Sequence, residues 1–174
     1  VSVGFVHGVM NTDNMTISGE TIDYGPCAFI DNYDPQAVFS SIDSQARYAY
    51  GNQANMAQWN LARLAETLIY LINSENPEQA VEVATQELKA FPEIYQAQWL
   101  KCMRAKLGLL KELPNDLALI NDLHSQMESQ TADFTQLFRS LSDVVRGDAT
   151  TARALVKDPT EFDHWLKAYQ NRSE

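Results

Sequence analysis

From residue 54 to the end of the chain, apolar residues recur with the spacing of one face of an α-helix. Asn76 followed by Pro77 is typical of a helix start, because Asn caps the first turn and Pro lacks an N–H that would be unpaired there. Pro92 is expected to end or kink that helix. The residues expected to form the buried stripes are Met56, Trp59, Leu64, Leu68 and Leu71; Tyr95, Trp99 and Met103; Leu117, Ile120, Leu123 and Met127; Phe134, Leu137, Phe138, Leu141 and Val145; and Phe162, Trp165, Leu166 and Tyr169.

The first 53 residues have a different pattern. They hold five of the seven glycines and many Asp, Asn and β-branched residues, which is typical of short strands and ordered loops. Val1–Val6 is predicted to be a strand, and Thr16–Ile17 and Thr21–Ile22 flank a polar turn, as in a tight hairpin. The sequence therefore predicts a mainly α fold, in which a short β-hairpin region (residues 1–53) is followed by a helical bundle (residues 54–174).

The charge balance narrows the function classes. The chain of 174 residues has 13 Lys and Arg against 23 Asp and Glu, a formal net charge of −10. Non-specific binding to nucleic acid or to an anionic membrane needs a basic face, so neither is an expected partner. No apolar run approaches the roughly 18 residues of a membrane span, and the N-terminal stretch lacks the basic flank of a signal peptide. We expect a cytoplasmic protein.

The two cysteines, Cys27 and Cys102, are too few for a disulfide framework and do not have the spacing of a metal site. We expect both to be small buried apolar groups, with a redox role as the alternative.

One segment carries a pattern of chemical groups. Protein kinases place a metal-binding Asn seven residues after the His of their His-Arg-Asp loop, and a later Asp-Phe-Gly motif supplies the main metal carboxylate. Here Asn14 follows His7 by seven residues, and Asp23 begins an Asp-Tyr-Gly motif beyond the hairpin. Val9 occupies the position of the kinase catalytic Asp, so the usual base is missing, and Asp13 stands directly before Asn14.

These groups suit a site for Mg²⁺ and a triphosphate. Mg²⁺ prefers hard oxygen ligands and takes one or two carboxylates together with waters and phosphate oxygens. Asn14 and Asp23 can supply the protein ligands, and Asp13 can accept a proton from an attacking hydroxyl or orient it. Taken alone, Asp13 and Asn14 are also common turn formers, and His7 is expected to bond to the backbone of the metal loop.

The wider sequence resembles one family. The string HGVMNTDNM…TIDYGP, with DNYDP, QARYAYGNQ and WNLARLAE downstream, is similar to the SelO (selenoprotein O) family of protein adenylyltransferases, which are kinase-like pseudokinases. The resemblance covers most of the chain and is strongest over residues 4–68. It implies the C-terminal lobe of a protein-kinase-like fold, in a protein that binds ATP in an inverted orientation. It also implies transfer of AMP from ATP to Ser, Thr or Tyr hydroxyls of proteins.

The resemblance further implies a role for each candidate residue. Asp13 would be the proton acceptor, and Asn14 and Asp23 would be the metal ligands, with Asp23 contacting ATP through the metal. The expected cofactor is Mg²⁺, with Mn²⁺ as an alternative, and the expected partners are ATP and protein substrates. The expected location is the cytoplasm for a bacterial-type protein, and the mitochondrion for eukaryotic relatives.

Parts of the family pattern are missing from these residues. In the family, the Gly-rich loop, the Lys with its Glu partner and the phosphate-binding Arg residues lie upstream of the loop that begins at His7, and only six residues precede His7 here. We therefore expect a piece of a longer protein that is inactive by itself. The family's C-terminal tail, which often ends with Cys or selenocysteine, is also absent, and Cys27 replaces a common Phe.

Two other functions stay open at this point. The complete protein could transfer the γ-phosphoryl group as a kinase, with Asp13 in place of the missing base. Alternatively, the chain could be a helical interaction module with a vestigial metal loop. Arg47, the only basic residue among the first 53, could meet a phosphate, anchor the segment after the Asp-Tyr-Gly motif, or pair with a neighbouring Asp.

Overall fold

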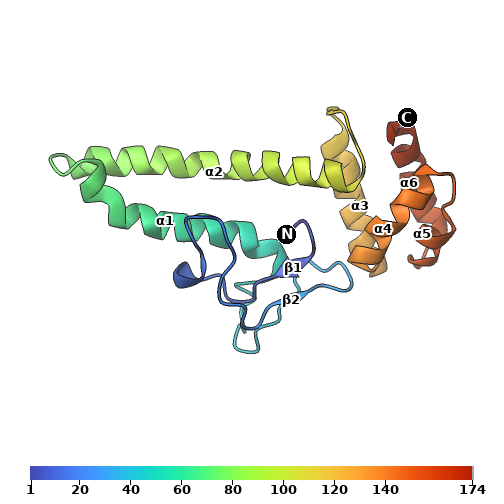
Figure 1. Ribbon diagram of the computed structural model, residues 1–174, viewed down its shortest axis with the longest axis horizontal. Coiled ribbons are helices and arrows are strands. Elements are labelled where there is room, and N and C mark those ends of the chain that lie inside the picture. Colours follow the sequence, from blue (N-terminus) through green and yellow to red (C-terminus); the bar gives the residue numbers. More distant parts are fainter. Residues whose placement is uncertain (174) are drawn as a thin grey trace. The chain divides into compact units, whose positions relative to one another are not determined.

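The structure is a computed structural model that describes residues 1–173 (Figure 1). The prediction of a mainly α fold, with a short β region followed by helices, is confirmed. Within the described residues, no helix is both long and apolar enough to cross a membrane. The elements in chain order are β1 (Phe5–Val6), the 3₁₀ helix η1 (Thr12–Asn14), β2 (Ala28–Phe29), the 3₁₀ helix η2 (Tyr50–Asn52), α1 (Gln53–Ile72), α2 (Pro77–Lys106), α3 (Asp116–Gln130), α4 (Phe134–Val145), α5 (Thr150–Ala154) and α6 (Pro159–Ser173).

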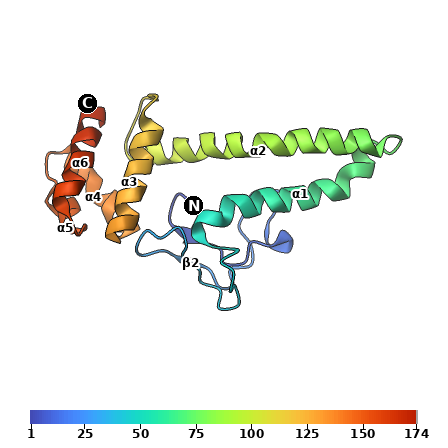
Figure 2. The same cartoon turned by 180° about the vertical axis from the view of Figure 1, so that it is seen from behind.

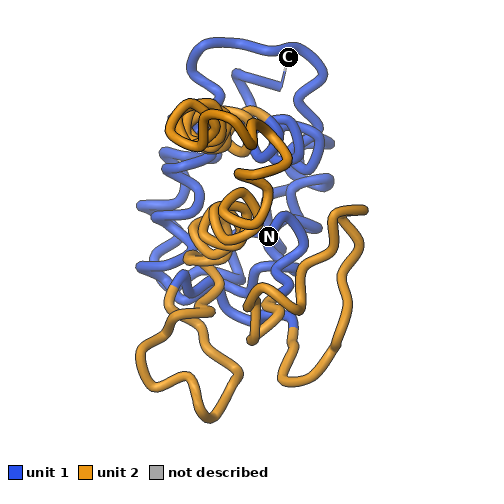
Figure 3. The backbone as a smooth tube through the Cα atoms, turned by 90° about the vertical axis from the view of Figure 1, so that its left-hand side faces the viewer, with its two compact units in different colours: residues 1–5, 29–35, 98–174 blue, residues 6–28, 36–97 orange. Residues whose placement is uncertain are grey.

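The chain forms two compact units, which Figure 3 distinguishes by colour. The first unit consists of residues 1–5, 29–35 and 98–174, and it holds the end of α2 and helices α3 to α6. The second consists of residues 6–28 and 36–97, and it holds η1, α1 and the greater part of α2. The candidate chemistry lies in the second unit.

The core of the first unit follows the predicted stripe of α6, whose four members Phe162, Trp165, Leu166 and Tyr169 are all buried. Trp165 donates its indole N–H to the Leu119 carbonyl in α3 (2.8 Å), and Tyr169 donates its hydroxyl to the Leu107 carbonyl (2.8 Å). The polar ends of these two large aromatic side chains are therefore satisfied inside the core.

In α4, one predicted core position is wrong. Val145 is 57% exposed, whereas its neighbour Val144 is buried. Ser140, one turn before Val144, is also buried. The packing partners of the last turns of α4 therefore lie on the side that carries Ser140 and Val144, and the helical period alone does not reveal that side.

The first unit buries one carboxylate, that of Asp116 at the start of α3. Arg172 Nε donates to it at 2.6 Å and Arg104 Nε at 2.7 Å, and the Leu113 N–H adds a third hydrogen bond at 2.9 Å. The hydrogen bond from Arg172, above all, lowers the pKa of Asp116 to about 2. The acid thereby joins side chains from α2, α3 and α6.

Replacing Asp116 by Asn should lower the free energy of unfolding by about 3 kcal/mol, because the change leaves two arginines beside an uncharged partner. The pKa of Asp116 is lower in the folded chain than its usual value of 3.8. The ionised Asp116 therefore stabilises the fold above that pH, and this stabilisation is lost as the pH falls towards 2. It amounts to roughly 2 kcal/mol of the free energy of unfolding. Urea unfolding at a series of pH values between 5 and about 2 measures this loss.

The exposed Asp122 in α3 offers a matched control through Asp122→Asn, which should leave the unfolding free energy nearly unchanged. An Asp116→Asn variant with the same acid dependence of stability as the wild type would contradict the assigned role of this carboxylate.

In the second unit, α2 begins as the sequence predicts but continues further (Figure 2). Asn76 Oδ1 accepts the Gln79 N–H (3.1 Å), as expected for the capping residue. Of the two effects expected of Pro92, an end of the helix or a kink, the end is wrong, because α2 runs through Pro92 to Lys106. Since proline has no N–H, the carbonyl of Leu88 loses its helical partner. It accepts a hydrogen bond from Gln58 Nε2 of α1 instead (3.3 Å).

The prediction that the apolar stripe of α1 is buried holds only for Met56. It is wrong for the other four positions, which are exposed: Trp59 (39%), Leu64 (36%), Leu68 (36%) and Leu71 (82%). The apolar pattern of α1 therefore predicts more buried residues than this helix has in the structure. The exposed part of α1 lines an apolar pocket of about 510 Å³ together with α2, at Leu64, Leu68, Ala84, Leu88 and Phe91 among others.

The predicted β features are present in shortened form. The strand expected over Val1–Val6 comprises only Phe5–Val6, because Gly4 has φ +74° and donates its N–H to the Val1 carbonyl in a turn (3.1 Å). The expected turn of the hairpin is confirmed, with Gly19 at φ +77°. Met15 and Thr21 form a single antiparallel bridge there, without regular strands.

The two cysteines are free thiols, of which Cys27 is half-buried and Cys102 exposed. The expectation that both are buried is therefore wrong for Cys102, whose position on α2 faces away from the core.

Candidate active site

The loop of residues 7–14 approaches the segment that follows the Asp-Tyr-Gly motif. Gly8 has φ +84°, and a Cβ placed on it would lie 2.7 Å from the Pro26 carbonyl oxygen. A side chain at this position would therefore displace backbone, not only a flexible neighbour. The glycine allows the start of the loop to lie against Pro26, three residues after Asp23.

His7 ties the same two segments together. Its ring Nε2 lies 2.7 Å from the Ile22 carbonyl oxygen, so that nitrogen carries the proton and donates it, since a carbonyl only accepts. The ring Nδ1 then accepts from the Val9 N–H at 3.4 Å. The histidine is buried, as expected for a residue that bonds to backbone, and it fixes the residue next to Asp23.

Asn14 ends the 3₁₀ turn η1 and is buried at 9% exposure. Its side-chain Nδ2 donates to the Val9 carbonyl (2.9 Å), and its backbone N–H donates to the Asn11 carbonyl (3.1 Å). With the amide nitrogen used in this way, the amide oxygen is the atom left to bind a cation. This orientation is the one that a metal-binding Asn requires.

The two carboxylates of the candidate site are exposed. Asp13 lies within η1, and Asp23 has φ +55°, a left-handed conformation that Asp tolerates better than most residues. The antiparallel bridge between Met15 and Thr21 brings Asp13, Asn14 and Asp23 to the same end of the hairpin. Among the described residues, neither carboxylate forms a hydrogen bond or an ion pair.

The donor set of this site fits Mg²⁺. In the described part of the chain, no cluster of three His, Cys, Asp or Glu residues could hold a metal ion. One amide oxygen and one or two carboxylates at an exposed hairpin end are the partial shell that Mg²⁺ uses when phosphates and waters complete its coordination. The roles of Asp13, Asn14 and Asp23 stay predictions.

Two side chains of α1 hold the loop, and neither was among the residues predicted from the sequence to form the site. Gln53 Oε1 accepts the His7 backbone N–H (3.0 Å). Asn60 Nδ2 donates to the Met10 carbonyl (3.0 Å) and the Asn11 carbonyl (3.2 Å). The signal that could have found them is their place in the apolar stripe, because Gln53 and Asn60 fall on the face that also carries Met56.

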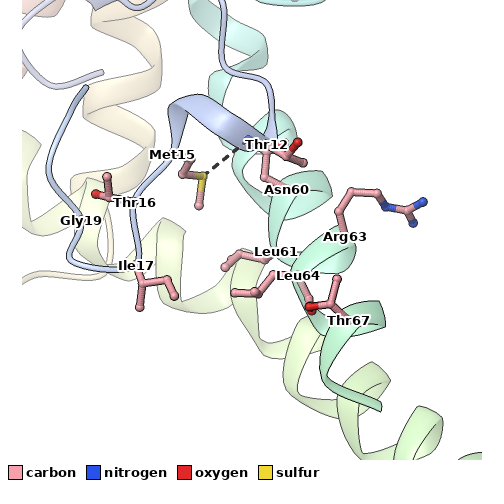
Figure 4. Close-up of a pocket in the computed structure, with 10 residues that line it drawn as sticks. All are labelled: Thr12, Met15, Thr16, Ile17, Gly19, Asn60, Leu61, Arg63, Leu64 and Thr67. Carbon is pink, nitrogen blue, oxygen red and sulfur yellow. Dashed lines mark hydrogen bonds between the residues drawn. The ribbon is translucent and has the colours of Figure 1, made fainter. Parts of the chain in front are cut away.

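A pocket of about 630 Å³ lies beside this loop, between the hairpin and α1 (Figure 4). Met15 and Ile17 of the hairpin line one side, and Leu61 and Leu64 of α1 line the other. Thr12, the residue before Asp13, also lines it, so the pocket adjoins the candidate site.

Comparison with known proteins identifies the family. The family model described as "Protein adenylyltransferase SelO" matches residues 1–174, which is the whole chain. The chain belongs to the SelO family. This confirms the resemblance carried by the loop and the Asp-Tyr-Gly motif.

Several curated relatives of this SelO-family chain bear the name "Protein nucleotidyltransferase YdiU". The protein of Rhizobium leguminosarum bv. trifolii is 55% identical over 173 residues, which cover 98% of this chain and 34% of the relative. The Clostridium botulinum (strain 657 / Type Ba4) protein is 55% identical over 170 residues, and that of Alkaliphilus metalliredigens 53% over 171, each covering 98% of this chain and 33% of the relative. The chain thus spans about a third of the length of these relatives.

Of the roles weighed from the sequence for Arg47 of the SelO-family chain, pairing with a neighbouring Asp is not found among the described residues, and contact with a phosphate stays a prediction. Its guanidinium carbon lies 4.6 Å from the centre of the Trp59 ring, over its face, and 5.7 Å from that of Tyr48. Within the described residues it forms no ion pair. The nearby carboxylate of Asp43 accepts backbone N–H groups instead, from Arg47 (2.9 Å) and Tyr48 (2.8 Å). The arginine therefore serves to pack this segment against α1.

Replacing Gly8 by Ala should lower the free energy of unfolding by about 2–3 kcal/mol, because the new Cβ combines left-handed strain with a backbone overlap at Pro26. Gly19→Ala is the matched control, since Gly19 has a similar φ of +77° but no atom within 4 Å of the methyl group that the substitution adds. That control should lose only about 1 kcal/mol. Urea unfolding compares the two, and equal losses would contradict the close approach of Gly8 to Pro26.

Proposed function

We propose that the complete protein is a Mg²⁺- and ATP-dependent protein adenylyltransferase, which transfers AMP from ATP to Ser, Thr or Tyr hydroxyls of other proteins. Membership of the SelO family and the names of the relatives support this proposal. The observation that carries it is the placement of Asp13, Asn14 and Asp23 at one end of the hairpin, with the Asn14 amide oxygen left for a cation. Because the chain spans a third of its relatives, the activity is assigned to the complete protein.

Each residue has a defined task in this proposal. The Asn14 amide oxygen and the Asp23 carboxylate hold Mg²⁺, or Mn²⁺ in its place. The bound cation supplies neutralising charge for the phosphates of ATP. Asp13 accepts the proton of the attacking hydroxyl, whose oxygen forms the bond to the α-phosphorus while pyrophosphate leaves. Asp13 is exposed and uses no hydrogen bond within the described chain, so it can meet an incoming hydroxyl.

The charge distribution of the chain suggests that other parts of the complete protein supply the groups that bind the triphosphate. Arg47 is the only Lys or Arg among the first 53 residues, and its guanidinium lies over the Trp59 ring. Triphosphate recognition needs cationic or backbone N–H groups in addition to the metal. We therefore expect such groups to come from elsewhere in the complete protein, and the 174 residues alone to be inactive. ATP and bacterial relatives favour a cytoplasmic location.

Isotope transfer tests the proposal and its alternatives together. The complete protein, with Mg²⁺ and a protein acceptor, is given ATP labelled at either the α- or the γ-phosphate. Label from the α position alone is the expected result. Label from the γ position alone would identify kinase-type phosphoryl transfer, and no label from either, together with no stabilisation by Mg²⁺-ATP in thermal melting, would favour the non-catalytic interaction module.

Asp23→Asn and Asp13→Asn should each reduce AMP transfer by about 10²-fold or more, since each removes a charge required by the chemistry. Asn is the sharper replacement for Asp23 because it keeps the side-chain volume and also tolerates the left-handed φ of +55°. Glu82→Gln, an exposed acidic position on α2, controls for the change in net charge and should retain full activity. Wild-type rates in both site variants would refute the assigned roles.

A further inference from the structure

Asn60 is a buried polar side chain that the proposed function leaves without a task. It lies in the third turn of α1 and is 5% exposed. Its Nδ2 donates to the carbonyls of Met10 (3.0 Å) and Asn11 (3.2 Å). The same nitrogen lies 3.6 Å from the Met15 sulfur, a contact drawn as a dashed line in Figure 4. All these contacts are made with the loop and hairpin that carry Asp13 and Asn14.

At this position a buried amide is less favourable for the stability of the fold than an apolar side chain would be. Asn60 lies on the same face of α1 as Met56 and Leu64, where an apolar side chain would need no hydrogen bonds. Moreover, its Oδ1 is buried without a hydrogen-bond partner among the described residues. An unsatisfied buried acceptor is unfavourable for stability. What the amide does supply is a donor directed at two consecutive backbone carbonyls.

Those carbonyls control the geometry of the candidate site. Met10 and Asn11 immediately precede η1, which contains Asp13 and Asn14. The Asn11 carbonyl accepts both the Asn60 side chain and the backbone N–H of Asn14 (3.1 Å). A movement of this carbonyl would therefore move the turn that carries the proton acceptor and the metal ligand.

The anchoring helix is well suited to this task. Gln53, seven residues before Asn60 and so on the same face of α1, accepts the His7 N–H at the beginning of the loop. Asn60 holds the loop near its end. The loop between His7 and Asn11 has no regular secondary structure. Its backbone is held at both ends by side chains of one continuous helix of 20 residues.

We propose that Asn60 is a positioning residue for the transfer reaction: by holding the Met10 and Asn11 carbonyls, it places Asp13 and Asn14 correctly for proton acceptance and metal binding. This inference rests on the proposed function. Asn60 touches neither the metal nor the nucleotide in this scheme, and it acts only through the backbone of the loop. Loss of such positioning costs about 10- to 100-fold in rate when a reacting group moves by roughly 1 Å.

The test compares Asn60→Asp and Asn60→Ala with wild type in the complete protein. Asp keeps the shape of Asn but replaces the donor by an oxygen that faces two carbonyls, and Ala removes the whole group. Asn55→Asp is the matched control, since Asn55 lies on the same helix but is exposed. For each variant, kcat and KM for ATP are measured from α-labelled ATP, and the folded fraction is measured by circular dichroism.

The expected result is a fall in kcat of about 10- to 100-fold per folded enzyme for both Asn60 variants, with KM for ATP changed less than about threefold. Asn55→Asp should match wild type. A purely structural role would change the folded fraction but not kcat per folded enzyme. Wild-type kcat in Asn60→Ala would therefore overturn the inference, even if Asn60→Asp fails to fold.

Hydrogen exchange separates this inference from the proposed function. The backbone N–H of Asn14 donates to the Asn11 carbonyl, so this amide should be protected from exchange in the wild type. In Asn60→Ala it should exchange at least about 10-fold faster, whether or not the protein transfers AMP. No α-label transfer by the wild type would refute the proposed function alone, whereas unchanged exchange of the Asn14 amide in Asn60→Ala would refute the positioning role alone.

Discussion

The attachment of the loop of residues 7–14 to helix α1 is the constraint on which the candidate site depends. The loop contains no strand or α-helix after β1, only the short turn η1, so its own backbone hydrogen bonds cannot define its path. Gln53 and Asn60 supply the missing partners from one face of α1. A rigid helix thereby sets the position of the residues that are proposed to bind a metal ion and accept a proton from a hydroxyl group.

Histidine and glycine complete this arrangement from the loop side. The His7 ring reaches the Ile22 carbonyl, and Gly8 lies against Pro26, so the Asp-Tyr-Gly segment is held from two sides. Asp23 itself has a left-handed backbone, a conformation that is retained only where its surroundings enforce it. The site thus combines a helix-anchored acid and amide with a second acid whose backbone carries strain.

Polar groups placed in apolar surroundings recur in both compact units. Asn60 interrupts the apolar stripe of α1, and Asp116 is fully buried at the start of α3 between two arginines. The two differ in how completely they are satisfied. Asp116 has donors at both oxygens, which makes it a contributor to stability, whereas Asn60 leaves one oxygen unpaired among the described residues. The unpaired Asn60 oxygen suggests that an amide is present at this position because its nitrogen binds the loop, and not because the amide packs well in the core.

The sequence by itself determined the helical class, the capped start of α2 at Asn76, the buried stripe of α6 and, through its motifs, the family. Those features are local, because periodicity, caps and motif spacing each depend on residues that lie close together in the sequence. Only the tertiary structure decided that α2 continues through Pro92, since the Leu88 carbonyl finds its donor in Gln58, thirty residues away. It also decided that Leu71 is exposed and that Gln53 and Asn60 hold the loop. Burial and hydrogen-bond pairing between distant segments depend on which surfaces meet in space, and no pattern within one segment contains that information.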